Sequence, residues 1–141
     1  MISIRIAPQS LKRVKAKLHQ MTQRHQGRTL ESVRDEVNRY LVGWVNYYAL
    51  ADARRHLEEM DQWLRRRLRQ MRWKQWKTPA NRSHNLRALG VSEYWVKRAG
   101  GTSKGVWRLS ASPPLQQAMN NAYWRVFGLK SFADYYSLRR T

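Results

Sequence analysis

The feature of this sequence that most constrains its fold is the spacing of apolar side chains over residues 10–77. Apolar residues recur there every three or four positions, which places them on one face of an α-helix. The pattern predicts three helices: one that Ser10 caps and Gly27 ends, a second that Thr29 caps, and a third over residues 53–77. Their apolar faces consist of Leu11, Val14, Leu18, Met21 and His25, then of Leu30, Val33, Val37, Tyr40, Leu41, Trp44 and Tyr48, and then of Leu57, Met60, Leu64, Leu68 and Met71. Three amphipathic helices joined by short links predict a bundle.

The second part of the chain carries shorter and less regular signals. Short helices are expected at residues 85–89, 93–99 and 113–128, and after Ser131. A short strand is expected at Val106–Leu109, and residues 100–105 (GGTSKG) are expected to form a mobile loop. The predicted fold class is therefore mainly α. A three-helix bundle over residues 1–77 precedes a smaller, irregular helical subdomain over residues 78–141, with room for one short strand or hairpin.

The charge of the chain indicates an anionic partner. The sequence has 28 Lys and Arg against 9 Asp and Glu, a net charge of +19, and a charge of that size repels itself in a compact state unless it is offset. Nucleic acid is the first candidate partner. A membrane surface is the alternative, but the many helix caps and turns are not typical of a membrane-surface helix. Disorder is disfavoured because 42% of the residues are hydrophobic and seven are Trp.

Residue types and patterns that are absent from the sequence limit the expected compartment of the protein and the kinds of site it can contain. There is no Cys, so disulfides and thiolate zinc sites are excluded, and the cytoplasm is the expected compartment. No apolar run approaches about 18 residues, so no membrane span is expected. The acidic cluster of Asp52, Glu58, Glu59 and Asp61 lacks a convincing magnesium-site spacing, and the four His form no close pair. We therefore expect no catalytic residue, no metal site and no cofactor.

The most basic segment is residues 63–77 (WLRRRLRQMRWKQWK), with seven Lys and Arg and no acidic residue. On a helix at about 100° per residue, Leu64, Leu68 and Met71 share the core side. The opposite side carries what we call the basic arc: Arg65, Arg66, Arg69, Arg72, Trp73 and Trp76. Guanidinium groups contact phosphates and indole rings stack on unpaired bases, so this arc is predicted to bind nucleic acid. The alternatives are a solvated charged face, and Trp rings packed beneath the second subdomain.

Further basic residues extend the predicted interface. Lys74 and Lys77 continue the same helix, and Arg82 and Arg87 add charge in the second part of the chain. Lys12 and Arg13 lie on the first helix, where ordinary solubilising side chains are the alternative. The candidate nucleic-acid-binding residues are Arg65, Arg66, Arg69, Arg72, Trp73, Lys74, Trp76, Lys77, Lys12, Arg13, Arg82 and Arg87.

Six segments together carry a family resemblance. They are residues 5–13 (RIAPQSLKR), 41–52 (LVGWVNYYALAD), 61–77 (DQWLRRRLRQMRWKQWK), 86–91 (LRALGV), 106–113 (VWRLSASP) and 121–128 (NAYWRVFG). In this order and spacing they resemble the maturase-specific region of bacterial group II intron reverse transcriptases. The resemblance covers nearly the whole chain, and its specificity comes from the combination.

The resemblance implies a binding function without catalysis. Residues 1–77 would form the thumb, also called domain X, and residues 78–141 the DNA-binding region that follows it. The implied partners are intron RNA, template–primer or target DNA, and the polymerase fingers and palm of the same parent protein. The implied roles are RNA splicing through stabilisation of the ribozyme fold, and support of reverse transcription and intron mobility. The Tyr-Ala-Asp-Asp polymerase motif is absent, so this chain is not expected to polymerise.

Position by position, the resemblance supports the four arginines of the basic arc and residues 73–77 as the RNA-facing surface, followed by Lys12 and Arg13. Gln9 departs from the family pattern, which often has Lys there, and this puts a contact at that position in doubt. The alternative function is a general DNA-binding or architectural protein without intron specificity.

Overall fold

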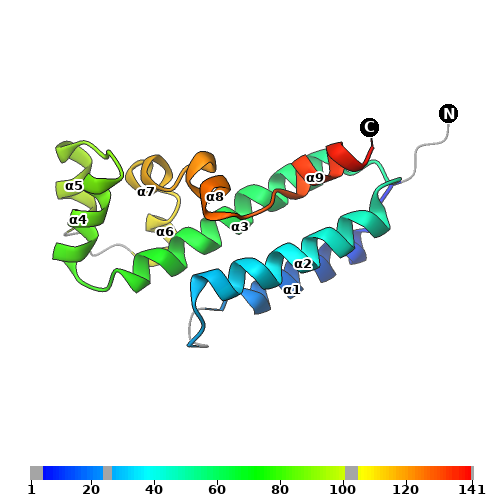
Figure 1. Cartoon of the computed structure of the whole chain (residues 1–141), viewed down its shortest axis with the longest axis horizontal. Coiled ribbons are helices and arrows are strands. Elements are labelled where there is room, and N and C mark those ends of the chain that lie inside the picture. Colours follow the sequence, from blue (N-terminus) through cyan, green and yellow to red (C-terminus); the bar gives the residue numbers. More distant parts are fainter. Residues whose placement is uncertain (1–4, 24–26, 101–104, 141) are drawn as a thin grey trace. The chain divides into compact units, whose positions relative to one another are not determined.

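The protein is almost entirely helical. The computed structural model describes residues 5–23, 27–100 and 105–140, and all regular secondary structure in these residues is helix. The helices of this part of the chain (Figure 1) are α1 (Pro8–Met21), α2 (Leu30–Tyr48), α3 (Arg54–Gln75), α4 (Pro79–Ala88), α5 (Glu93–Gly100), α6 (Val106–Leu109), α7 (Pro113–Ala118), α8 (Asn121–Phe127) and α9 (Phe132–Arg139). The mainly α fold class is confirmed.

The long helices agree with the predicted ones except at the ends of the first. Thr29 caps α2 as expected, because its hydroxyl accepts a hydrogen bond from the amide of Ser32 at 3.1 Å. The expected cap at Ser10 is wrong. The helix begins earlier, at Pro8, whose ring fixes a helical φ at the first turn, and Ser10 lies inside it. The predicted end at Gly27 is also wrong, since α1 ends at Met21; His25 lies outside the described residues.

The second part of the chain differs from the sequence prediction at two places. Val106–Leu109 forms the helical turn α6, so the predicted strand there is wrong; a run of four residues is too short for its period to separate helix from strand. The single helix expected over residues 113–128 is broken into α7 and α8 at Met119, whose φ and ψ of −114° and 62° are not helical. The expected mobile loop falls mostly on residues 101–104, outside the described residues.

The chain packs as two compact units. Unit 1 comprises Met1–Leu64 and Gly128–Thr141, and unit 2 comprises Arg65–Phe127, so α3 contributes residues to both. The functional boundary expected at residue 77 stays a prediction, because packing units and binding regions need not coincide.

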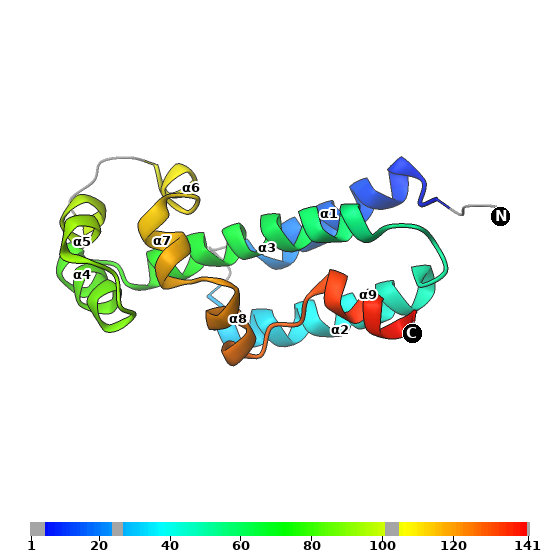
Figure 2. The same cartoon turned by 90° about the horizontal axis from the view of Figure 1, so that it is seen from above.

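Unit 1 buries most residues of the predicted apolar stripes, whereas Leu11, Tyr40, Trp44 and Tyr48 are half-buried. Its most deeply buried side chains include Val14, Leu18, Leu30, Val33, Val37, Leu41, Val45, Leu57, Leu64 and Phe132. The sequence did not reveal that α9 packs against α2, as Figure 2 shows. The ring of Phe132 lies edge-on to Trp44, with 6.0 Å between centroids. Unit 1 is therefore the predicted bundle with a fourth helix added to it.

Asn38 fixes the start of the segment that leads into α9. Its side-chain amide donates to the carbonyl of Gly128 at 2.8 Å, and its side-chain oxygen accepts from the amide of Lys130 at 2.9 Å. Gly128 has a φ of 100°, a conformation that L side chains rarely adopt. This turn therefore requires glycine.

Asp61 is a buried carboxylate that caps α9 from another helix. It is 4% exposed, and its oxygens accept hydrogen bonds from the Ser131 hydroxyl at 2.6 Å and from the amides of Phe132 and Ala133 at 2.7 and 3.0 Å. These amides belong to the first turn of a helix and have no partner within that helix. A negative charge at a helix N-terminus also interacts favourably with the helix dipole. The acidic residue closest to the arginine-rich segment is thus a structural residue.

Unit 2 is built from residues 65–75 of α3 and from α4 to α8. Helices α4 and α5 lie side by side, and α7 contacts both of them. Its core contains Leu68, Met71, Trp73, Leu86, Val96, Leu109, Leu115, Met119 and Trp124. The short helices are held by this apolar core because helices of so few residues are not stable alone.

We predict that Asp61→Asn lowers the free energy of unfolding by about 2–4 kcal/mol, because at least one buried donor in the first turn of α9 loses its charged acceptor. Urea or thermal denaturation followed by circular dichroism measures the change. The matched control is Glu58→Gln, which removes an exposed ion pair with Arg54 (3.0 Å) and should cost no more than about 0.5 kcal/mol. Equal effects of the two changes would contradict the assigned role of Asp61.

Candidate nucleic-acid interface

Unit 2 concentrates the positive charge of the protein. Residues 65–127 contain 14 Lys and Arg and one acidic residue, Glu93, which gives this unit a net charge of +13. Glu93 pairs with Arg87, whose Nε and Nη2 donate to its two carboxylate oxygens at 2.5 and 3.2 Å. The hydrogen bond from Arg87 lowers the pKa of Glu93, and the same bond raises the pKa of Arg87. The one carboxylate of unit 2 is therefore already paired with an arginine. The net positive charge of the unit is left without an acidic side chain of the same unit to neutralise it.

Two arginines of the basic arc hold α6 against α3 within unit 2. Arg66 donates from Nε and Nη2 to the carbonyl oxygen of Trp107 at 3.2 and 2.8 Å, and its guanidinium lies 3.9 Å from the centroid of the Trp107 ring. Arg69 donates from Nε to the carbonyl oxygen of Ser110 at 2.7 Å. Both arginines thereby donate to carbonyls in or just after a four-residue helix, and the Trp107 carbonyl also accepts from the Ser110 hydroxyl at 2.5 Å.

Arg69 is the most deeply placed of the basic side chains. It is 8% exposed, so the expectation that it lies on a solvent-facing arc is wrong. Burial, with smaller contributions from the neighbouring charges of Arg65 and Arg66, lowers the pKa of Arg69 to about 10. The side chain therefore stays charged at neutral pH, and its charge is held inside unit 2 by a backbone carbonyl. Its position fits a structural role better than a phosphate contact.

Trp73 is also inside unit 2. Its side chain is 2% exposed, so the expectation that it faces solvent is wrong and its ring is not open to a stacking base. The guanidinium of Arg82 lies 4.7 Å from the ring centroid, and its Nε donates to the Trp73 carbonyl at 3.0 Å. Burial lowers the pKa of Arg82. Trp73 therefore packs inside unit 2, which was the alternative to base stacking left open by the sequence. Trp76 is half-buried, and its ring lies 6.0 Å from the Trp73 ring between centroids, in an edge-on arrangement.

The remaining residues of the predicted interface in unit 2 are at least partly exposed. Those on or just after α3 are Arg65, Arg72, Lys74, Trp76 and Lys77. Arg72 donates to Gln75 at 3.0 Å and has its guanidinium 5.1 Å from the centroid of Phe127. Lys77 follows α3 with a φ of 57°, the left-handed conformation common just after a helix. Nucleic-acid contacts by these residues, and by Arg82 and Arg87, stay a prediction.

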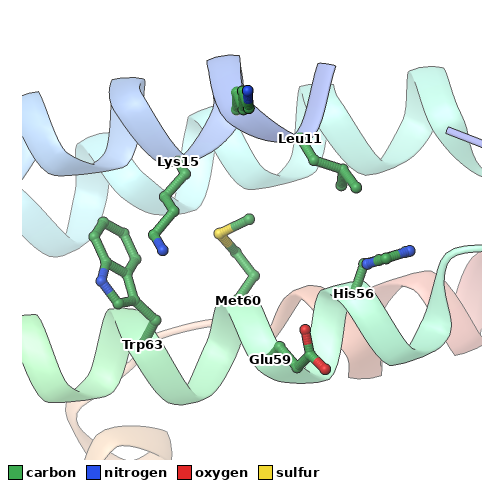
Figure 3. Close-up of a pocket in the computed structure, with 7 residues that line it drawn as sticks. Leu11, Lys15, His56, Glu59, Met60 and Trp63 are labelled. Carbon is green, nitrogen blue, oxygen red and sulfur yellow. The ribbon is translucent and has the colours of Figure 1, made fainter. Parts of the chain in front are cut away.

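In unit 1 the predicted residues Lys12 and Arg13 are exposed on α1. Lys12 also lines an open pocket of about 210 Å³ between α1 and α3, together with Leu11, Lys15, His56, Glu59, Met60 and Trp63. Figure 3 shows Leu11 and Lys15 extending from α1 toward Met60 and Trp63 on α3. The Lys15 ammonium lies 5.1 Å from the centroid of the Trp63 ring. Sequence reasoning missed this pocket, because the pairing of α1 with α3 is not visible in either helix alone.

The described residues give no sign of metal chemistry or of a membrane segment. Within these residues no group of three His, Asp or Glu side chains could hold a metal ion. The same part of the chain contains no helix that is both long enough and apolar enough to cross a bilayer.

Comparison with known proteins assigns the segment that contains the arginine-rich helix to a family. Residues 11–90, more than half of the chain, match a family model described as "Group II intron, maturase-specific domain". The match includes Lys12, Arg13 and all of α2, α3 and α4. It confirms the resemblance stated from the sequence segments. None of the curated proteins matches the chain.

We predict that Arg69→Ala lowers the free energy of unfolding by about 1–3 kcal/mol, because the buried carbonyl of Ser110 loses its donor. Arg65→Ala, a change to a partly exposed arginine of the same helix, should change it by no more than about 0.5 kcal/mol. Chemical denaturation of the two variants and of the unsubstituted protein measures both changes in the free energy of unfolding. If Arg69→Ala leaves stability unchanged and weakens RNA binding instead, Arg69 faces the ligand and its structural assignment is wrong.

Proposed function

The chain belongs to the family of group II intron maturase-specific domains, and on this premise we propose that it binds nucleic acid, with structured intron RNA as its main ligand. Its contacts are made by exposed Lys and Arg side chains of unit 2 and of α1. In this role the protein stabilises the folded ribozyme and so promotes RNA splicing. The same surface holds template–primer or target DNA when the polymerase fingers and palm of the parent protein act with it, in the cytoplasm.

The observation that carries this proposal is the charge of unit 2. A net charge of +13 in 63 residues, with its one carboxylate paired to Arg87, is costly for a compact fold unless an anion is bound. RNA and DNA present phosphates at regular spacing, and binding releases the counterions condensed on them. The positive charge thus provides affinity that does not depend on base sequence.

The residues proposed to contact phosphates differ from the complete basic arc. Arg66 and Arg69 already donate to the backbone carbonyls of Trp107 in α6 and of Ser110 directly after it, so they position the surface. Contacts are assigned instead to Arg65, Arg72, Lys74 and Lys77, supported by Arg82, Arg87, Lys12 and Arg13. Trp76 replaces Trp73 as the candidate for stacking on a base, because it is the less buried of the two.

The chain is assigned no catalytic residue in this proposal. The maturase-specific domain is a different part of such proteins from the polymerase active site. Asp61, the acidic residue nearest the arginine-rich segment, accepts hydrogen bonds from Ser131, Phe132 and Ala133. The second candidate function is general DNA binding without intron specificity, which the uniform positive charge of unit 2 also favours.

We predict a steep salt dependence of binding to structured intron RNA. With about six to ten phosphate contacts, affinity falls by about 10³- to 10⁵-fold between 50 and 200 mM salt. Fluorescence anisotropy with labelled intron RNA at several salt concentrations gives the slope. A flat salt titration would falsify the proposal. Equal affinity for the RNA and for unrelated duplex DNA would favour the general DNA-binding alternative.

A matched pair of double variants tests the residue assignment. Arg65→Gln with Lys77→Gln should reduce the magnitude of the logarithmic salt slope by about 2, because each lost phosphate contact contributes about 0.9. Arg54→Gln with Arg55→Gln removes the same charge from residues that pair with Glu58 and Glu59, at 3.0 and 3.6 Å, and should leave the slope nearly unchanged. Equal slopes for both double variants would mean that net charge, and not these positions, determines binding.

A further inference from the structure

Unit 2 contains a pocket beyond the residues matched by the family model. Its volume is about 460 Å³, and it lies where the second half of α5 meets α6 and the start of α7. The lining residues are Trp95, Arg98, Ala99, Arg108, Leu109, Ser112, Pro113 and Pro114. We propose that this pocket binds one unpaired nucleotide of a single strand, a proposal that rests on the nucleic-acid binding proposed above.

The pocket combines the two kinds of surface that a nucleotide needs. Trp95 is half-buried and presents an indole among apolar walls formed by Ala99, Leu109 and the two prolines. Such walls suit the faces of a base, which stack on aromatic rings in proteins that bind single strands. Arg98 and Arg108 place guanidinium groups at the same pocket, where they can meet the phosphate of the bound nucleotide.

Arg98 is held in place before any ligand arrives. Its guanidinium carbon lies 3.4 Å from the centroid of the Tyr94 ring, and its Nη1 donates to the Tyr94 carbonyl at 3.1 Å. A guanidinium is planar and delocalised, so stacking on Tyr94 uses one face and leaves its edge donors for an anion. A side chain that is already ordered loses less entropy when it binds.

The opposite wall of the pocket is held in place by the structural arginines of α3. Arg66 bonds the carbonyl of Trp107 and Arg69 bonds the carbonyl of Ser110, and these two residues flank Arg108 and Leu109 in the sequence. Pro113 and Pro114 further restrict the backbone at the start of α7. Ser112 also lines the pocket, and its hydroxyl oxygen is buried without a hydrogen-bond partner within the described residues.

Charge and size select the ligand. The lining contains two arginines and no acidic side chain, in a unit with a net charge of +13, so an anion is favoured over an amine or a basic peptide. The pocket volume lies at the lower end of the range of roughly 300–1,000 Å³ found for small-molecule sites, which suits one nucleotide. A base inside a duplex is covered by its neighbours and must leave the stack to enter, at a cost that an unpaired base does not have.

The first test compares single-stranded and duplex ligands. A fluorescein-labelled oligouridylate of about 12 nucleotides, within the usual range of site sizes, and a labelled RNA duplex of equal length are titrated by anisotropy. Trp95→Leu should weaken single-strand binding by roughly 5- to 150-fold, the effect of losing one stacked base, and leave duplex binding within about twofold. Trp95→Phe keeps an aromatic ring and should restore most of the affinity.

The control variant and a second measurement separate this effect from unfolding. Tyr47→Leu removes an aromatic side chain that is 81% exposed in unit 1 and should change neither affinity. In the unmodified protein, 4-thiouridine placed within the same oligonucleotide should crosslink under light to the peptide that contains Trp95. An unchanged affinity in Trp95→Leu, an equal loss for single strand and duplex, or crosslinks confined to other peptides each overturn the proposal.

The outcome also distinguishes this proposal from the proposed function. If the unsubstituted protein binds structured RNA with a steep salt dependence and Trp95→Leu has no selective effect, only the proposed nucleotide pocket is wrong. If the unsubstituted protein binds neither the single strand nor structured RNA, the proposed nucleic-acid-binding function itself is wrong.

Discussion

The charged side chains of α3 satisfy backbone groups at the ends of other helices, and the packing of both units depends on these bonds. In unit 1 the Asp61 carboxylate accepts from two amides in the first turn of α9. In unit 2 Arg66 and Arg69 donate to carbonyls that follow or lie within α6. Short helices expose a large share of unpaired peptide groups at their ends, so a fold made of many such helices needs partners for them. One long helix with charges along its length provides these partners.

The sequence predicted the long helices and most of the core because their apolar residues repeat with the helical period. The stripes of α2 and α3, such as Leu30, Val33 and Val37, are buried as expected. It predicted the cap at Thr29 for the same local reason, since the interaction spans only three residues. The packing of α9 on α2 could not be predicted in this way, because it joins Asn38 to Gly128 and Trp44 to Phe132 across about 90 positions.

The basic arc was predicted less well because a helical wheel assumes that a helix has one buried side. Arg66, Arg69 and Trp73 are spaced by three and four residues, so they form a second stripe that turns toward the other helices of unit 2. The signal was present in the sequence, since a Trp within that stripe favours burial. The neighbouring arginines made burial of this stripe hard to predict, because arginine is usually exposed unless a specific carbonyl or carboxylate accepts its hydrogen bonds. Ser110 and Trp107 provide those carbonyls from more than 40 residues away.

The split composition of unit 1 has a consequence for synthesis on the ribosome. Residues 128–140 complete this unit, yet they are translated after all 63 residues of unit 2. At roughly 5–20 residues per second, that delay is about 3–13 seconds. During this time the apolar surface of α2 near Trp44 and the carboxylate of Asp61 lack the Phe132 ring and the amides that later cover them. The first helices of unit 1 therefore leave the ribosome as an open bundle, and this surface is covered only after residues 128–140 have been added.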